Sequence, residues 1–415
     1  MNMSLPSTNL APSPLKTTLP VGMMILGGGI SVIGAGVSLL RDGGAAFGVA
    51  WLLAFLFFLN IAFGALFLVL VHHLTDAGWS VGIRRFCEHI AALLFPWLVL
   101  VFLPVALLAP KIYAWMTIDP ATDNTVAAKL PVFTQPGFWL TSAVFFGIWW
   151  LLTSQLKRWS LKQDETGAAE CTHKMRFYSG WGIVAFALTV TCSGVLWLKS
   201  VEHEWYSAMH GVYFFASSVW VGLATIYMLT VWLRARGVLK GVIQDGHFYN
   251  LGVLFFAFTV FQAYIEFAQY FVVWNANMPQ ETFWYLQREK GAWWAVSMIL
   301  IFGHFLIPFF LLLPAKVKSN VRVVVPVCLW AWLMHALDLA FNLWPAFRPM
   351  GLSARLVLLQ FGTLAFIGGF LAWVFLRNFA KHPPFPQRDP RLLEAMGVSA
   401  HVITDLGETN PGGAR

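Results

Sequence analysis

Charged residues are scarce in this chain, and their scarcity excludes a protein that is soluble in water. Asp, Glu, Lys and Arg make up 11% of the 415 residues, whereas apolar residues make up 58%. A soluble domain carries roughly 25% charged residues. Less than half of that share leaves too little polar surface to hydrate a 46.5 kDa protein. The sequence therefore predicts that most of the surface contacts lipid.

Cysteine motifs are missing as well. The four cysteines form neither a CxxC pair nor a CxxCH motif: Cys87, Cys171, Cys192 and Cys328. This spacing excludes covalently attached c-type haem, iron–sulfur clusters and zinc ribbons. The sequence also does not place two histidines opposite one another, as b-type haem requires. We therefore predict that this chain holds no metal and no redox cofactor, and that the cysteines are packing residues.

Long apolar runs are what the chain does contain. Ten runs are long enough to cross about 30 Å of hydrocarbon as helices, and they lack the alternation of barrel strands. We predict an all-α integral membrane protein with ten transmembrane helices. Tails at 1–20 and 377–415 flank a membrane domain at 21–376. The predicted spans are 21–40, 47–71, 89–109, 137–156, 179–198, 208–233, 248–274, 292–314, 321–344 and 353–376.

Basic residues in the connections orient these helices. Nineteen Lys and Arg lie in the tails and the even-numbered loops, whereas eight lie in the odd-numbered loops. Cytoplasmic segments carry the excess of basic residues, so both termini are expected in the cytoplasm. This distribution accounts for the net charge of +8 without a nucleic-acid partner. We expect the inner loop 157–178 to be the most charged connection, and 110–136 and 275–291 to be the longest outer loops.

Ionisable side chains inside the spans are the first candidate functional residues. A charge at mid-bilayer costs at least about 2.5 kcal/mol on insertion scales, so such residues need a partner or a role. In the seventh span, Glu266 shares one helix face with Gln262 and Gln269. In the ninth span, the i, i+3 spacing lets His335 and Asp338 meet.

Three further groups complete the candidate set. His304 is central and alone in the eighth span, whereas His210 and Tyr213 lie near the outer end of the sixth. Four residues at the cytoplasmic edge are expected at the membrane interface, where charge costs little: His72, His73, Glu88 and His89.

Two interpretations of these polar residues stay open. Carboxylates and imidazoles that face one another inside a bundle can pass protons along water, with the interfacial group as the proton entrance. Polar stripes also hold helices together through interhelical hydrogen bonds. Glu266, His335 and Asp338 favour the proton path, because a buried charge is costly to keep, whereas His304 by itself favours packing.

Long segments of the chain resemble one protein family. They are KRWSLKQDETG, HEWYSAMHGVYFFASS, LGVLFFAFTVFQAYIEFAQYFVVWNANMPQETFWYLQREKGAW, GHFLIPFFLLL, MHALDLAFNLWP and PPFPQRDPRLLEAM. The likeness runs from about residue 45 to 395, in order and with similar spacing. In these segments the chain is similar to the ActF subunits of alternative complex III, a bacterial quinol:cytochrome c oxidoreductase. These subunits belong to the NrfD-like membrane proteins.

The resemblance implies a fold, a location and partners. It implies two four-helix bundles flanked by two helices, in the lipid of the bacterial inner (cytoplasmic) membrane, beside an ActC-like subunit of the NrfD family. Multihaem and monohaem cytochrome c subunits and an iron–sulfur subunit would lie on the periplasmic side, and a terminal oxidase is a further partner. The chain would be a scaffold and proton path without a redox cofactor of its own, in a complex that binds quinol. The family's buried polar positions fall on Glu266, His304, His335 and Asp338.

One position departs from the family pattern, and two other functions stay open. Relatives carry an acidic residue before the Trp that ends the fifth span, where this chain has Leu196, so the chain either lacks this carboxylate or uses Glu202 or Glu204 in its place. The first alternative is an NrfD-type anchor that itself binds quinol at the outer face, near His210 and Tyr213. The second is a stand-alone secondary transporter, although the paired helix breaks of such folds are not evident.

Overall fold

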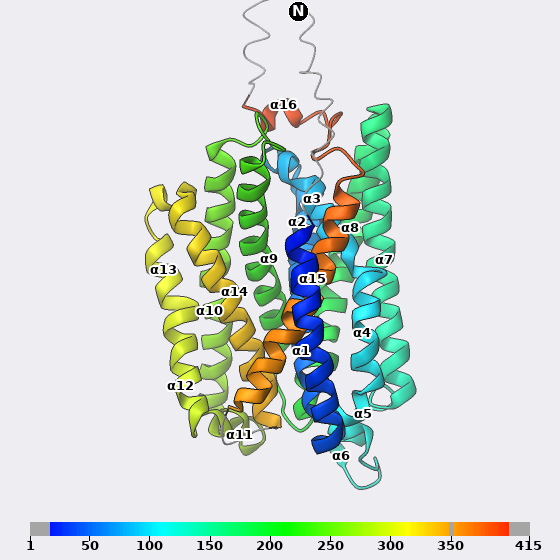
Figure 1. The fold of residues 1–415 in the computed structure, drawn as a ribbon, viewed down its shortest axis with the longest axis vertical. Helices are drawn as coiled ribbons and strands as arrows, with labels where there is room; N and C mark the ends of the chain where they lie inside the picture. Colours follow the sequence, from blue (N-terminus) through cyan, green and yellow to red (C-terminus); the bar gives the residue numbers. More distant parts are fainter. Residues whose placement is uncertain (1–16, 348–351, 398–415) are drawn as a thin grey trace, which may run out of the picture.

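The computed structural model describes residues 17–347 and 352–397, and these residues are helical with no strand (Figure 1). Ten of their helices are long and apolar enough to cross a membrane. The prediction of an all-α, ten-span membrane protein is confirmed. Residues 1–16 and 398–415, which belong to the two predicted tails, lie outside the described residues, as do residues 348–351.

The ten spans follow one another in the order of the sequence. They are α1 Thr18–Asp42, α2 Ala45–Thr75, Gly78–Leu107 (α3 Val81–Ala91 and α4 Trp97–Leu107), α7 Gln135–Thr166, Ala169–Glu202 (α8 Ala169–Ser193), α9 His210–Ala235, α10 Asp245–Ala276, Ala292–Leu312 (α12 Ala292–Ile299 and α13 Ile307–Leu312), α14 Val321–Leu343 and α15 Ala354–Phe379. Short helices lie in the connections: α5 Ala109–Ile112, α6 Asn124–Ala127, α11 Pro279–Arg288 and α16 Leu392–Ala395.

The spans pack as two groups of four and one outer pair. Spans two to five contact one another around α2 and α8, and spans six to nine around α9, α10 and α14. The outer pair is α1 and α15, which cross closely in Figure 1. A Cβ atom at Gly27 would lie 2.4 Å from the backbone nitrogen of Phe366, so glycine permits this crossing.

The two groups of four meet where α2 crosses α9. A Cβ atom added to Gly64 would lie 2.8 Å from the Cα of Gly222, and one added to Gly222 would lie 2.7 Å from the Cα of Gly64. Two backbones approach this closely only when neither residue carries a side chain. This glycine pair therefore sets the distance between the two halves of the protein.

Two connections differ from their predicted form. The predicted inner loop 157–178 is wrong, because α7 continues to Thr166 and α8 begins at Ala169 after a turn at Gly167, whose φ is 64°. The third span begins at Gly78, well before its predicted start at 89. In both places the helix is longer than its apolar run. Charged residues extend the helix beyond the hydrocarbon, and outside the hydrocarbon they pair with one another.

Both ends of the described chain lie at one end of the bundle. The start of α1, the end of α15 and α16 are all at the top of Figure 1, and α11 is at the opposite end. We call the α16 end the inner end and the α11 end the outer end, following the predicted orientation.

Candidate functional site

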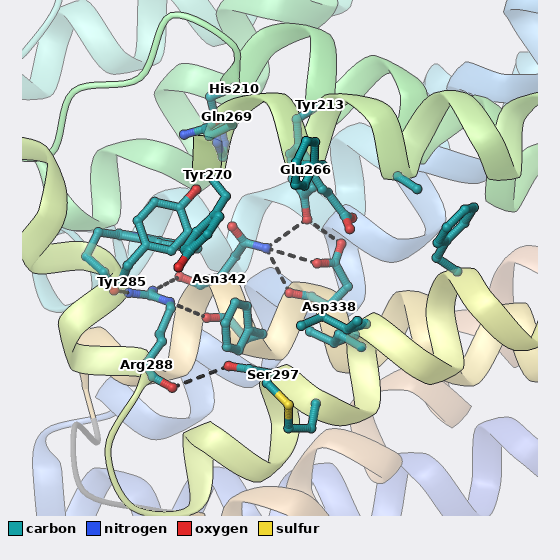
Figure 2. A pocket seen from close by; sticks show the side chains of 18 of the residues that line it. His210, Tyr213, Glu266, Gln269, Tyr270, Tyr285, Arg288, Ser297, Asp338 and Asn342 are labelled. Carbon is teal, nitrogen blue, oxygen red and sulfur yellow. Dashed lines mark hydrogen bonds between the residues drawn. The ribbon is translucent and has the colours of Figure 1, made fainter. Parts of the chain in front are cut away.

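A large cavity lies near the outer end of the second group of helices (Figure 2). Its volume is about 1030 Å³, and its walls come from α9, α10, α12, α14 and the stretch after α12, with α11 beside them. Most of the lining is apolar or aromatic. The polar side chains that reach it include His210, Tyr213, Glu266, Gln269, Arg288, Ser297, Asp338 and Asn342.

A hydrogen-bonded group surrounds Asp338 at the inner end of this cavity. The hydroxyl of Tyr213 donates to Oδ2 of Asp338. Asn342 lies one turn further along α14, and its Nδ2 donates to the Tyr213 hydroxyl at 2.8 Å and to Oδ1 of Asp338 at 3.3 Å. The buried carboxylate therefore has a donor for each of its oxygens, and this fixes its orientation toward α10 (Figure 2).

Glu266 and His304 complete the cluster from two other helices. Gln262 donates from Nε2 to Oε1 of Glu266 at 2.8 Å, one turn apart on α10. One carboxylate oxygen of Glu266, one of Asp338 and one ring nitrogen of His304 all lie within 4.8 Å of one another. His304 is the one ionisable residue of the eighth span, and the fold places it beside the acids of two other spans.

Arg288, at the end of α11, holds the outer side of the cavity together. It donates to the backbone carbonyls of Phe341 at 2.9 Å and of Asn342 at 3.0 Å, and it lies 3.3 Å from a carboxylate oxygen of Glu202. Its guanidinium also stacks over the ring of Trp284, 3.6 Å from the centroid. Burial lowers the pKa of Arg288 to about 10, so it remains charged at neutral pH.

An apolar wall of the cavity lies on the side of the molecule that faces lipid. Tyr264 and Phe267 on α10 and Trp294 and Ile301 on the eighth span all line the cavity and are all more than half exposed. These residues are exposed on spans that are long and apolar enough to cross a membrane, so a hydrophobic molecule dissolved in the bilayer would have access to the cavity from the side.

His210 also contributes an unsatisfied polar atom to the cavity. Its ring lies between those of Trp205, at 5.8 Å, and Tyr213, at 5.5 Å between centroids. The residue is buried, and its Nε2 has no hydrogen-bond partner among the described residues. Buried polar atoms are rarely left unpaired, so this nitrogen is available to a bound ligand.

His335 belongs to a different group from Asp338, although the two are one turn apart. Its Nδ1 lies 3.1 Å from the hydroxyl of Ser217, and its Nε2 lies 3.2 Å from Nδ2 of Asn60 on α2. No hydrogen bond joins it to Asp338 within the described part of the chain. The ring of His335 instead extends the polar contacts from the second group of helices toward the first.

The four residues expected at the inner interface are in fact buried. His72, His73, Glu88 and His89 are at most 3% exposed. Arg84 donates to Asp389 at 2.5 Å and lies 3.3 Å from Glu88, and Arg85 pairs with Glu88 and Asp164. The chain after α15 covers this group, so at the inner end these residues lie beneath protein and not in contact with water.

The two glutamates that could substitute for the missing acid at the end of the fifth span lie in different surroundings. Glu202 pairs with Arg288 beside the cavity, whereas Glu204 is exposed. Leu196 is buried in a π-helical stretch, Gly194–Leu198. Arg288 had no assigned role in the sequence, where it counted only as a loop charge. Its aromatic surroundings, FWYLQREKGAW, were the one available signal, since arginine stacks on aromatic rings.

Comparison with known proteins adds no assignment to this geometry. The chain matches no protein-family model, and it matches no curated protein sequence.

Proposed function

We propose that this chain is a quinol-binding membrane subunit of a respiratory quinol:cytochrome c oxidoreductase, similar to alternative complex III. One observation carries the proposal: a cavity with a lipid-facing apolar wall ends at Asp338, Glu266 and Tyr213. Its volume of about 1030 Å³ is at the upper end of the range for small-molecule sites. An isoprenoid quinol has this character, with an apolar chain and a polar head that releases protons.

The chemistry of quinol oxidation assigns a role to each polar residue. A quinol that becomes a quinone loses two protons and two electrons. Glu266 and Asp338 are the proton acceptors, since both carboxylates line the cavity and a positioned carboxylate can take a proton from a hydroxyl within hydrogen-bond reach. His210 Nε2 holds a head-group oxygen. The electrons pass to the redox groups of partner subunits, which the resemblance places at the outer side.

The protons leave at the outer side under this proposal. Asn342 contacts Asp338 through its side chain, and its carbonyl accepts from Arg288, which in turn pairs with Glu202. Glu202 is partly exposed at the outer end of the fifth span. These contacts lead from Asp338 toward the outer end, and the complex would release quinol protons on that side of a bacterial inner membrane.

A fluorescent hydroxyquinoline N-oxide, which mimics a quinol head group, tests the proposal. Its fluorescence is followed as the complex, reconstituted in lipid nanodiscs, is titrated. We expect stoichiometric quenching for the natural protein and a dissociation constant at least tenfold higher for Asp338→Asn. Glu281→Gln is the matched control, because it removes one outer carboxylate that does not line the cavity.

Equal binding by Asp338→Asn and the natural protein would overturn the proposal. A probe that is displaced from a partner subunit alone, with photocrosslinks that never reach this chain, would do the same.

A second candidate is a proton path without quinol, supported by the polar contacts that continue inward from Ser217 through His335 to Asn60. Asn60 and His72 are 12 residues apart on α2, which is about 18 Å, and every α2 residue between them is apolar. The path would need ordered water over this distance. If Glu266→Gln abolishes proton translocation in a complex that never binds the N-oxide in this chain, this second candidate is the correct one.

A further inference from the structure

From the arrangement of Glu266, His304 and Asp338 we infer a binding site for a divalent transition-metal ion, of which Zn²⁺ is the test case. The site lies at the inner end of the cavity described above. One ligand atom of each residue lies within 4.8 Å of the other two. The residues come from three different spans, α10, the stretch after α12, and α14.

His304 is held toward the two acids with nothing bonded to its Nε2. The residue is 2% exposed, and this nitrogen has no hydrogen-bond partner among the described residues. The ring packs against Trp220, with centroids 4.1 Å apart, and the Trp220 indole is itself fixed by a hydrogen bond to Thr259. A buried imidazole that has an unpaired nitrogen and lies beside two carboxylates is suited to a metal ion.

A local departure from α-helix gives His304 this direction. Leu300–Leu306 is π-helical, and the extra residue in the turn rotates the side chains after it around the helix axis. The indole of Trp330 donates to the carbonyl of Gly303 at 2.7 Å, so this irregular turn keeps its backbone oxygen satisfied. Such turns are frequent at functional sites. An ordinary α-helix is more stable, so a π-helical turn is retained where function requires it.

The two carboxylates lack a cation of their own. Among the ion pairs formed within residues 17–347 and 352–397, none includes Glu266 or Asp338. Two acids this close inside the membrane repel when both are ionised. A divalent cation between them compensates both charges at once, which no neutral ligand does.

The surrounding hydrogen bonds match those around known metal ligands. Gln262 donates to Glu266, and Tyr213 and Asn342 donate to Asp338, so each carboxylate is oriented from behind by a neutral side chain. Zn²⁺ takes imidazole nitrogen and carboxylate oxygen at about 2.1 Å in a tetrahedral arrangement. Three protein ligands leave the fourth position for water from the cavity.

A second acid and histidine cluster in the outer loops provides the contrast. His203 Nε2 already lies 3.1 Å from Asp123 Oδ2, and Glu204 beside them is exposed. The Nε2 of that imidazole therefore already has a partner. The same three residue types thus occur twice among the described residues, and in the outer cluster the histidine is already paired with its acid.

The metal site itself does not depend on quinol binding, but its consequence rests on the proposed function. A metal ion between Glu266 and Asp338 occupies the oxygens that would accept quinol protons. Zn²⁺ would then inhibit quinol oxidation from within this chain.

The test is a Zn²⁺ titration of the intact complex in nanodiscs after removal of metals with a chelator. We expect one high-affinity site for Zn²⁺. His304→Gln should lower the affinity of this site at least tenfold, whereas His203→Gln should leave it unchanged. Zinc X-ray absorption should show one nitrogen and several oxygen ligands. Equal affinity in His304→Gln, or an oxygen-only spectrum, would overturn the inference.

Two further measurements distinguish a missing metal site from failed assembly and from failed quinol binding. If His304→Gln does not assemble, Glu266→Gln is titrated in its place, and binding that survives Glu266→Gln counts against the site. Hydroxyquinoline N-oxide binding is measured on the same samples. Zinc binding without N-oxide binding refutes only the quinol proposal, and N-oxide binding without zinc binding refutes only the metal site.

Discussion

The hydroxyl of Tyr213 on α9 donates a hydrogen bond to the carboxylate of Asp338 on α14, 125 residues later in the chain. The same hydroxyl accepts from Asn342 at 2.8 Å. This pair closes the inner end of the cavity, and it joins the two helices whose polar stripes the sequence had presented separately. Tyr213 thus positions the carboxylate that we propose as a proton acceptor.

Tyr213→Phe should lower the kcat of quinol oxidation by the complex about tenfold and leave KM nearly unchanged. A hydrogen bond to a charged group contributes about 1.5 kcal/mol, which corresponds to that factor. The loss falls on kcat because Tyr213 acts through Asp338 during proton transfer. Tyr249→Phe, which removes the hydroxyl of an exposed tyrosine on α10 that does not line the cavity, is the control. A rise in KM with unchanged kcat would contradict this role.

Gly64→Ala should destabilise the protein by about 1–3 kcal/mol, because a Cβ atom there would lie 2.6 Å from the carbonyl oxygen of Ser218 and 2.8 Å from the Cα of Gly222. The helices must separate to admit it. The measurement is the thermal unfolding midpoint in detergent. Gly147→Ala is the matched control, since nothing lies within 4 Å of a Cβ at that position. Equal midpoints for the two variants would show that the α2–α9 crossing is not tight.

Asp389→Asn should lower the stability of the inner end by about 3 kcal/mol at pH 7, because it breaks a buried ion pair with Arg84. Burial of Asp389 opposes ionisation, but the hydrogen bond from Arg391 and the charge of Arg84 outweigh it and hold the pKa of Asp389 below its ordinary value. A carboxyl with a lowered pKa stabilises the fold above its unfolded pKa of about 3.9, and that contribution disappears as pH falls further.

The unfolding midpoints of Asp389→Asn and the natural protein should therefore converge as the pH is lowered below about 4. Asp245→Asn is the control, since its partner Arg234 lies at the surface and the Asp245 side chain is 86% exposed. A difference that stays constant from pH 7 to pH 3 would mean that the Asp389 charge contributes nothing.

Labelling of single cysteines should show α11 on the outside of the cell membrane. Gln280→Cys, at the exposed start of α11, should react with a membrane-impermeant maleimide in intact spheroplasts. Lys316→Cys, in the exposed connection after α13, should react only after permeabilisation. The physical reason is the excess of basic residues in the connections on the Lys316 side. The reverse pattern would invert the orientation and place the cavity at the cytoplasmic side.

The sequence identified the polar faces of the helices but not their partners. The spacing of Gln262, Glu266 and Gln269 correctly predicted one polar stripe, because helical periodicity is a local property. The i, i+3 spacing of His335 and Asp338 suggested a pair, yet their side chains bond to different helices. Proximity along one helix permits a contact, and the neighbouring helices decide whether it forms.

By itself, the sequence determined immersion in lipid, the ten helices and the polar residues that they carry. Length and hydropathy suffice for these, since each span must satisfy its own backbone hydrogen bonds in hydrocarbon. Only the tertiary structure decided that His304 faces Glu266 and Asp338, that Arg288 turns inward under Trp284, and that residues after α15 cover His72 and Glu88. Those contacts depend on the depth and rotation of helices that are far apart in the chain. The contacts of His304 also depend on a π-helical turn, which rotates the side chains that follow it about the helix axis.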